Sequence, residues 1–348
     1  MILLFTPHPP VLRWQRVGPG CRLGERGECD AAGCEPVLHR AAGAGALEAV
    51  GYLLLHGGEA VAEEVRRLGP EDLPGLAATV PYLPEANDLT LAAVRAGLAV
   101  VPAIDHFLLC DTAFFSALPA EASQYAIPIR LRRRGLRRFG ACGVWHRWAW
   151  EQVRHRGRGE ISRVLSVYLG NGTNLAAIRD GGPVETTVGF TGLEGIPSAT
   201  GCGDLDPMIP LHLRASGMTF AEISRLLGRG SGFGGLLGKP CSLRRLLTEE
   251  TDPAVHEVRE LYLYSLCKHA GSLIAALGGI DAVAVVGEEG DLCERVAGLL
   301  AGWISPVRRA EPGPASGELQ SLAFSGKRNQ ILAEQIRRAQ SRGGHHDG

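Results

Sequence analysis

A glycine-rich tetrad is the segment whose composition most directly suggests chemistry. It reads Leu169-Gly170-Asn171-Gly172 and lies between two runs of strand type. Glycines let a turn bring several backbone N–H groups close together, and such concave turns bind phosphate oxygens. An ordinary hairpin turn has the same composition, and from the tetrad alone it is the more common structure. The tetrad therefore indicates a phosphate loop only where other segments agree.

Several further segments agree in type and in order. Downstream of the tetrad the chain reads V-G-F-T-G-L-E-G-I over 188–196 and G-D-L-D-P over 203–207, and upstream it reads H-G-G-E at 56–59 and D-T-A-F at 111–114. Together with Gly287-Glu288 these segments resemble the ordered motifs of the acetate kinase family, L-G-N-G, G-F-T-P-L-E-G and G-T-R-S-G-D-I-D-P among them. The resemblance covers about residues 50–338, whereas the first fifty residues match poorly.

The resemblance implies an α/β fold of the duplicated, two-lobed actin-like and sugar-kinase-like type, with ATP in the cleft between the lobes. We expect residues 1–112 to form the N-terminal lobe, completed by a C-terminal helix over 325–342. Residues 113–324 would form the nucleotide-binding lobe, and 343–348 a disordered tail. The reaction that the family performs is attack of a carboxylate oxygen on the γ-phosphorus of ATP, with Mg²⁺ bridging phosphates.

The resemblance also assigns candidate site residues. The catalytic candidates are Asp111 and His146. The nucleotide candidates are Leu169, Gly170, Asn171, Gly172, Arg244, Gly287 and Glu288. The candidates for the carboxylate pocket are Leu55, Tyr82, Ala141 and Gly192, and no metal ligands are assigned.

Some of these candidates have a structural alternative. Asp111 follows a predicted strand, so it is either the active-site carboxylate that the resemblance implies or a turn residue. His56 and His146 can be hydrogen-bonded core histidines, and Asp204 or Asp206 can cap the helix that follows.

The chain departs from the family pattern at charged positions. The arginine that holds the substrate carboxylate aligns with Leu53, and the arginine that stabilises the transferring phosphoryl group aligns with Gly201. A histidine that contacts this group aligns with Cys142, the histidine before the tetrad aligns with Tyr168, and the glutamate that helps hold Mg²⁺ falls near Arg328. Two anions must meet in this reaction, so the loss of cations is costly.

Two functional hypotheses follow. One is a binding or regulatory relative in which carboxylate phosphorylation is strongly impaired or absent, since one lost transition-state donor lowers a rate by about 10²–10³. The alternative is an active carboxylate kinase with a rewired site and a different substrate. A basic run could supply replacement charge, although such runs are more often solvated surface. The run comprises Arg130, Arg132, Arg133, Arg134, Arg137 and Arg138.

Hydrophobic periodicity predicts the elements that position these residues. The predicted strands are 52–55, 106–110, 163–170, 175–179 and 281–286, with a hairpin turn at Asp180-Gly181-Gly182. The predicted helices are 59–68, 88–98, 146–155, 219–227, 253–277, 291–303 and 327–338. Pro253 at a helix start and Gly278 at its end fit the known asymmetry of helix termini.

Composition limits the class of protein. The 348 residues are 45% hydrophobic and 21% charged, with a formal net charge of −1, which excludes a disordered chain and gives no support to nucleic-acid binding. The apolar start ends at Thr6, too early for a signal peptide or a membrane span, so we expect a cytoplasmic protein.

Cysteine usage and oligomeric state complete the expectations. Nine cysteines suit reduced thiols better than a secreted disulfide framework. Cys21, Cys29 and Cys34 could be metal ligands, but no C-x-x-C pair occurs and zinc normally requires four donors. The resemblance implies a homodimer through the C-terminal lobe, for which apolar residues of 253–277 are candidates unless they fill the lobe's own core.

Overall fold

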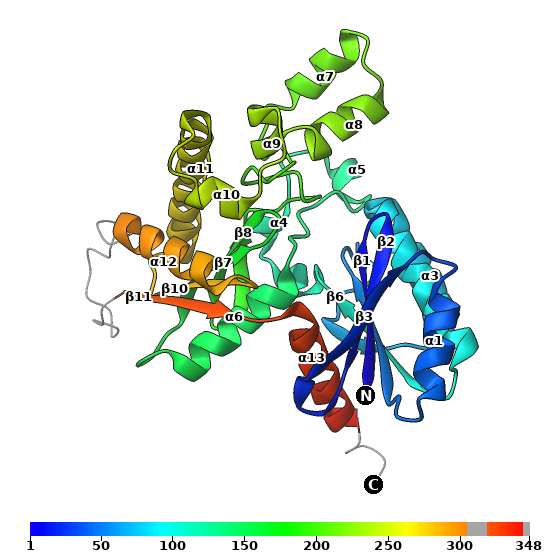
Figure 1. The fold of residues 1–348 in the computed structure, drawn as a ribbon. Helices are drawn as coiled ribbons and strands as arrows, with labels where there is room; N and C mark the ends of the chain where they lie inside the picture. Colours follow the sequence, from blue (N-terminus) through cyan, green and yellow to red (C-terminus); the bar gives the residue numbers. More distant parts are fainter. Residues whose placement is uncertain (305–318, 344–348) are drawn as a thin grey trace. The chain divides into compact units, whose positions relative to one another are not determined.

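The computed structural model describes residues 1–304 and 319–343 (Figure 1). Its contacts divide the chain into two compact units. Unit 1 contains Met1–Ser116, Ala141–Val144 and the segment that begins at Gly326, whereas unit 2 contains Ala117–Gly140 and the described part of Trp145–Ser325. The lobe boundary at residue 112 stays a prediction. Of the predicted disordered tail, Gly343 is the last residue of a helix, and 344–348 lie outside the described residues.

Unit 1 is built on a mixed sheet with the strand order β3-β2-β1-β4-β6-β5 (Figure 1). The strands are β1 (Ile2–His8), β2 (Val11–Val17), β3 (Leu23–Cys29), β4 (Ala49–Leu54), β5 (Val65–Arg67) and β6 (Asp105–Cys110). β1, β2 and β3 form an antiparallel meander. β4 runs parallel to β1, and β6 runs parallel to β4. The outer strand β3 exposes most of its side chains.

Helices cover both faces of this sheet. They are α1 (Cys34–Gly43), α2 (Leu73–Ala77), α3 (Pro84–Val100) and α13 (Arg328–Gly343), with short 3₁₀ turns at Pro19–Cys21, Pro70–Asp72, Val80–Tyr82 and Ala113–Ala117. Leu3 and Phe5 share a buried cluster with residues of α1 and α3. On the opposite face Ile336 of α13 lies so close to Gly51 that a side chain at position 51 would collide with it. Strand alternation thus directs successive residues of β1 to different layers.

Unit 2 contains a second mixed sheet, with the order β11-β10-β7-β8-β9. Its strands are β7 (Arg163–Leu169), β8 (Thr173–Arg179), β9 (Gly182–Thr186), β10 (Ala282–Gly287) and β11 (Gln320–Ser325). β7, β8 and β9 again form an antiparallel meander, and β10 and β11 add in parallel to β7. A three-stranded meander followed by two parallel strands is therefore common to both units, which confirms the predicted duplication.

Helices of unit 2 cover both faces of its sheet, while α7 (Met208–Ala215) and α8 (Phe220–Arg229) form a hairpin away from the sheet (Figure 1). The further helices are α4 (Ala120–Ser123), α5 (Ile129–Arg132), α6 (Gly143–Arg156), α9 (Gly232–Leu237), α10 (Leu243–Thr248), α11 (Pro253–Leu277) and α12 (Gly290–Ile304). The core on one face joins Leu165 and Val167 to apolar residues of α11 and α12. On the other face Trp145 of α6 stacks on Tyr168, with ring centroids 5.2 Å apart.

The sequence patterns predicted most of the regular elements after residue 50. Helix α11 begins at Pro253 after the cap Asp252, whose side chain accepts the N–H of Ala254, and ends at Gly278 with a left-handed φ of 69°. The predicted helix over 59–68 is wrong, because this segment contains strand β5, which pairs antiparallel with β6. Within 1–304 and 319–343, no helix has both the length and the apolar character that crossing a membrane requires.

Candidate functional site

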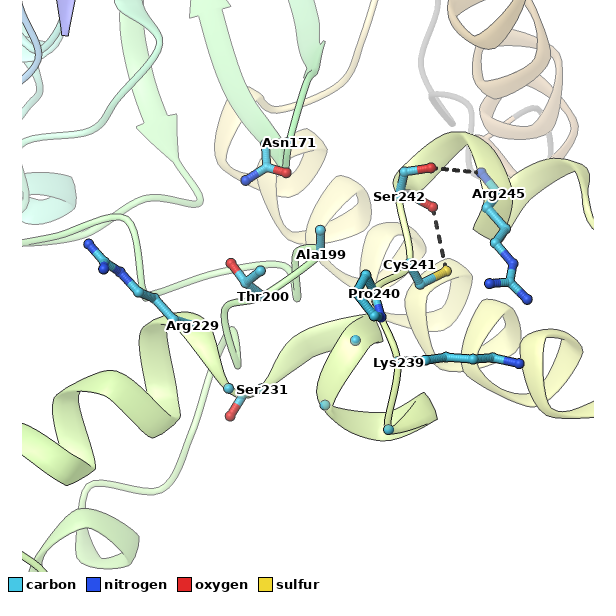
Figure 2. Close-up of a pocket in the computed structure, with 14 residues that line it drawn as sticks. Asn171, Ala199, Thr200, Arg229, Ser231, Lys239, Pro240, Cys241, Ser242 and Arg245 are labelled. Atoms are coloured by element: carbon cyan, nitrogen blue, oxygen red, sulfur yellow. Dashed lines mark hydrogen bonds between the residues drawn. The ribbon is translucent and has the colours of Figure 1, made fainter. Parts of the chain in front are cut away.

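A pocket of about 860 Å³ lies in unit 2 and includes Asn171 of the glycine-rich tetrad in its wall (Figure 2). Thr200 and Ser231 add hydroxyl groups, and several glycines leave the interior open. Figure 2 shows Arg229 on one side of the pocket, with Lys239 and Arg245 on the other. None of the lining residues is acidic.

The three cations of this pocket were missed in the sequence analysis. Arg229 ends α8, Lys239 follows α9 and Arg245 lies in α10, so only the fold brings them to one pocket. Lys239 Nζ lies 3.3 Å from an Asp252 carboxylate oxygen, and Arg245 pairs with the same group at 3.7 Å. The signal that could have indicated the pocket is the glycine-rich run G-R-G-S-G-F-G-G over 228–235.

The tetrad itself closes the β7–β8 hairpin, as its structural alternative predicted. The Gly170 N–H donates to the carbonyl of Gly172 at 2.9 Å. The carbonyl of Asn171 accepts the N–H of Ala199 at 3.2 Å, which fastens the turn to the neighbouring loop. The turn thus places Asn171 at the pocket. The segment can therefore be a hairpin turn and still contribute a residue to the site.

Two other nucleotide candidates lie near the carboxyl ends of parallel strands. Gly287 at the end of β10 is paired with Leu169 at the end of β7, and a Cβ atom at position 287 would lie 2.6 Å from the Leu169 carbonyl oxygen. Glu288 follows directly. Arg244 binds Glu289, and its two terminal nitrogens each lie 2.8 Å from Asp291 oxygens. Two carboxylates therefore already balance the charge of Arg244 in this structure.

Asp111 joins two separate segments of unit 1 through hydrogen bonds. Its carboxylate accepts the backbone N–H of Cys142 at 2.9 Å and that of Val144 at 3.3 Å, and its carbonyl accepts the N–H of Gly143 at 2.8 Å. Any side chain at position 143 would strike this carbonyl. These bonds explain why Ala141–Val144 belongs to unit 1.

Burial and the neighbouring charged and hydrogen-bonding groups shift the pKa of Asp111 in opposite directions. Burial raises the pKa of this carboxyl, while the charge of Arg328 and the two N–H donors lower it in part. Arg328 belongs to the same unit, so a cation stands near this carboxylate although the family pattern would place an acid close to position 328. The structure is compatible with both a structural and a catalytic Asp111.

His146 is enclosed in unit 2. Its Nδ1 atom lies 2.8 Å from Ser166 Oγ, and the side chain is fully buried. Burial lowers the pKa of His146 to about 3. At neutral pH the imidazole is therefore uncharged, which favours the core-histidine alternative for this catalytic candidate.

The buried imidazole predicts a pH dependence of stability. The unfolded chain takes up a proton near the ordinary pKa of 6.5, but the folded chain resists it down to about 3. Stability from this group is thus complete above about pH 6.5 and falls as the pH drops toward 3, by up to about 1.4 kcal/mol per pH unit. We expect His146→Gln to lose this slope in urea unfolding, while His155→Gln, exposed on the same helix, keeps it. Equal slopes in all three proteins would contradict the assignment.

The carboxylate-pocket candidates fall in both units. Tyr82 stacks on His56 with ring centroids 5.0 Å apart, and Leu55 directly precedes that histidine. Ala141 precedes Cys142, whose N–H binds Asp111, and the three candidates Leu55, Tyr82 and Ala141 belong to unit 1. Gly192 lies in unit 2, where a Cβ atom at this position would meet nothing within 4 Å. Their role in a carboxylate pocket stays a prediction.

The positions predicted to have lost charge are occupied by neutral groups that fit their surroundings. Leu53 lies in β4 with 2% of its surface exposed. Gly201 donates its N–H to Ser198 Oγ at 2.7 Å in a loop of unit 2. Cys142 adopts a positive φ of 59°, which is uncommon for a residue with a side chain. None of these residues carries a cation.

Three of the six arginines in the basic run over 130–138 contact neighbouring side chains. Arg138 binds Glu194, and its guanidinium lies 5.5 Å from the ring centroid of Tyr125. Arg132 donates to Gln124, and Arg137 lies over the ring of Phe139. These contacts of Arg132, Arg137 and Arg138 stabilise the segment before position 139.

Comparisons with known proteins agree with the motif analysis. A model of the acetokinase family matches residues 40–301. The chain belongs to this family. It is similar to the acetate kinase of Thermosynechococcus vestitus, with 33% identity over 268 residues that cover 73% of this chain and 63% of that protein. The acetate kinase of Pseudomonas aeruginosa is 32% identical over 290 residues, covering 81% of this chain and 73% of that protein.

The chain's match therefore spans somewhat less than two thirds of the length of the first of these relatives. Solved acetate kinases have a similar fold. The Porphyromonas gingivalis structure superimposes with a TM-score of 0.81 at 22% identity, covering 97% of this chain and 98% of that one. The Entamoeba histolytica structure gives 0.83 at 18% identity, with 97% and 98% covered. The predicted two-lobed, actin-like α/β fold is confirmed.

Proposed function

We propose that this acetate kinase family member binds a nucleotide in unit 2 and that its transfer of phosphoryl groups to short-chain carboxylates is strongly impaired or absent. It then acts as a binding or regulatory relative of the active kinases. The observation that carries the proposal is the neutral occupancy of positions 53 and 201, where the family pattern has arginines. Leu53 is buried in strand β4, so an apolar core side chain stands where the family pattern has the first of these arginines.

Phosphoryl transfer to a carboxylate requires two anions to meet. A carboxylate that approaches a triphosphate needs cations and hydrogen-bond donors around the equatorial oxygens of the transferring group. Preorganised donors of this kind usually provide the largest share of the rate. A site without both arginines keeps the scaffold but loses the charge that stabilises the transition state.

The pocket in unit 2 fits the nucleotide part of the proposal. Its volume of about 860 Å³ is in the range of small-molecule sites, and the glycines of its wall leave room for a ring system. Asn171 and the basic side chains at either side are suited to phosphate oxygens. When bound, ATP would supply the phosphoryl group.

Within 1–304 and 319–343 no group of three or more His, Cys, Asp or Glu side chains is arranged to hold a metal. Both carboxylate oxygens of Asp111 already accept backbone N–H groups. Mg²⁺ commonly binds through phosphates with one or two carboxylates, so here it would enter with the nucleotide phosphates rather than occupy a cluster of protein ligands.

A rewired active kinase is the second candidate function. It is favoured by Arg229, Lys239 and Arg245 at the pocket of unit 2, and by Arg328 near Asp111 in unit 1. In this alternative, cations that are absent from the family motifs would replace the two lost arginines. A coupled assay with ATP, Mg²⁺ and acetate or propionate separates the two candidates.

We also propose that the chain forms a homodimer through unit 2. Of the apolar residues of α11 that the sequence analysis considered, Leu266, Leu273 and Ile274 are buried in the core of unit 2. Leu261 of α11 is exposed. The helices α7 and α8 form a hairpin (Figure 1), and it also exposes large apolar side chains. These residues are Met208, Ile209, Leu211, Phe220 and Leu226. Five exposed large apolar side chains on two neighbouring helices are a candidate interaction surface.

Phe220, with 75% of its surface exposed, provides the test of the dimer. We expect light scattering to give twice the chain mass for the unaltered protein and for Ile129→Glu, a change at an exposed apolar residue on α5. Phe220→Glu should shift the mass toward one chain, because a buried unpaired carboxylate costs several kcal/mol at an interface. A monomeric unaltered protein at micromolar concentration would refute the proposal.

A further inference from the structure

Two cysteines of unit 1 lie side by side outside the region that matches the family. Cys29 ends β3 and Cys34 begins α1, and their Sγ atoms are 3.9 Å apart. Both precede residue 40, where the family match begins. Cys21, the third cysteine considered as a metal ligand, lies instead beside Arg337, whose Nη1 is 3.8 Å from its Sγ. The three cysteines therefore do not form one metal site.

The turn between β3 and α1 creates this proximity. The side chain of Asp30 accepts the N–H of Gly33 at 2.7 Å, and the Cys34 thiol points at the Asp30 carbonyl at 3.6 Å. A Cβ atom on Gly33 would lie only 2.8 Å from the Cβ of Cys29. Glycine at position 33 thus lets the two cysteines approach each other.

We propose that Cys29 and Cys34 are a modification site, where a reversible intramolecular disulfide forms with a low-molecular-weight disulfide such as oxidised glutathione as the oxidant. This inference goes beyond the proposed function and does not depend on it. Cys34 is buried and Cys29 is half-buried, so Cys29 is the thiol that a small reagent reaches first. Closing the bond requires the sulfur atoms to move from 3.9 Å to about 2.05 Å.

The exchange has two balanced steps. The thiolate of Cys29 attacks one sulfur of oxidised glutathione, whose S–S bond breaks and releases one glutathione thiolate. The thiolate of Cys34 then attacks the sulfur of Cys29 and displaces the second glutathione. The two cysteines together lose two electrons and two protons. These electrons and protons are taken up by the two molecules of reduced glutathione that are released. An excess of reduced glutathione reverses the sequence.

The surroundings make this exchange slow at neutral pH. Burial raises the pKa of Cys29, and it raises the pKa of Cys34 to about 12, with Asp30 and Glu35 adding negative charge. Tyr52 of β4 also faces Cys34. Because the thiolate is the reacting form, the pair should react faster in alkaline solution.

The test is differential alkylation with mass spectrometry after incubation with oxidised glutathione at about pH 9, where more thiolate is present. We expect Cys29 and Cys34 of the full-length protein to become protected from alkylation together and to yield a peptide cross-linked between them, whereas the exposed Cys267 can only form a glutathione adduct. Cys34→Ser should instead accumulate a glutathione adduct on Cys29, since the resolving thiol is absent. A stable adduct on Cys29 of the unaltered protein, or two cysteines that stay alkylatable, would overturn the proposal.

A matched glycine pair controls for effects on folding. Gly33 has an ordinary φ of −71°, so alanine is compatible with the backbone there, but its Cβ would displace the side chain of Cys29. We expect Gly33→Ala to close the disulfide roughly tenfold more slowly. Gly43→Ala, at a position where a Cβ meets nothing within 4 Å, should behave as the unaltered protein. Equal closure rates in both variants would contradict the geometry.

Discussion

In a coupled assay with ATP, Mg²⁺ and acetate, this chain should turn over at least about 10²–10³-fold more slowly than an active family member. This factor corresponds to the loss of one transition-state donor, because the effects of losing several residues that act as a unit do not add. Positions 53 and 201 both lack the guanidinium of the family pattern, so the true loss is expected to exceed this lower bound. The acetate kinase of Pseudomonas aeruginosa, assayed in parallel, is the reference.

Calorimetric titration with ATP and ADP, with and without Mg²⁺, completes this experiment. Binding without turnover would support the impaired relative, and an absence of binding would remove the nucleotide from the proposal. Turnover close to that of the reference would refute impairment and favour the rewired kinase. In that event Arg229→Ala should abolish the activity, whereas Arg225→Ala, which lies outside the pocket wall on the same helix, should leave it unchanged.

Replacement of Asp111 by alanine should lower the free energy of unfolding by about 2–4 kcal/mol. The change leaves the N–H groups of Cys142 and Val144 without their acceptor, and each unsatisfied group costs about 1–3 kcal/mol. Part of this loss is offset, because burial already raises the pKa of Asp111 and so disfavours its charged form. Urea unfolding monitored by circular dichroism measures the difference.

Two variants sharpen this experiment. Asp111→Asn keeps one carbonyl acceptor and should lose less stability than the alanine variant. Asp105→Ala removes the partly exposed partner of the exposed Arg67 and should cost at most about 1 kcal/mol. If Asp111→Ala and the unaltered protein have the same free energy of unfolding, the carboxylate does not stabilise the fold. A catalytic role then becomes the better explanation.

Local patterns explain why the second half of the fold was predictable. The turn at Asp180-Gly181-Gly182 and the cap pattern around Pro253 act within a few residues of chain, so the sequence alone predicts them. β5 was missed because 59–68 has amphipathic spacing, and only its pairing with β6 makes residues 65–67 a strand. The outer strand β3 of the N-terminal meander was missed because most of its residues are polar or glycine and exposed.

The candidate site was predictable only where its residues lie in one motif. Asn171 was predicted from the tetrad, and it does line a pocket. The same pocket takes Thr200, Ser231 and Lys239 from separate loops, and no sequence spacing relates them. Tertiary packing also determines the protonation state of His146, because burial lowers its pKa. The sequence motif around His146 resembles a catalytic one and gives no sign of this burial.

The outer strand of unit 1 has a consequence for the behaviour of concentrated solutions. Unpaired edges are where sheets from different molecules join into fibrils. β3 carries alternating charges on its exposed residues, with Glu25 bound to Arg16 and Glu28 to Arg13 of the adjacent strand. An incoming strand would have to bury these charges. The edge is thereby protected against amyloid-like stacking at high protein concentration.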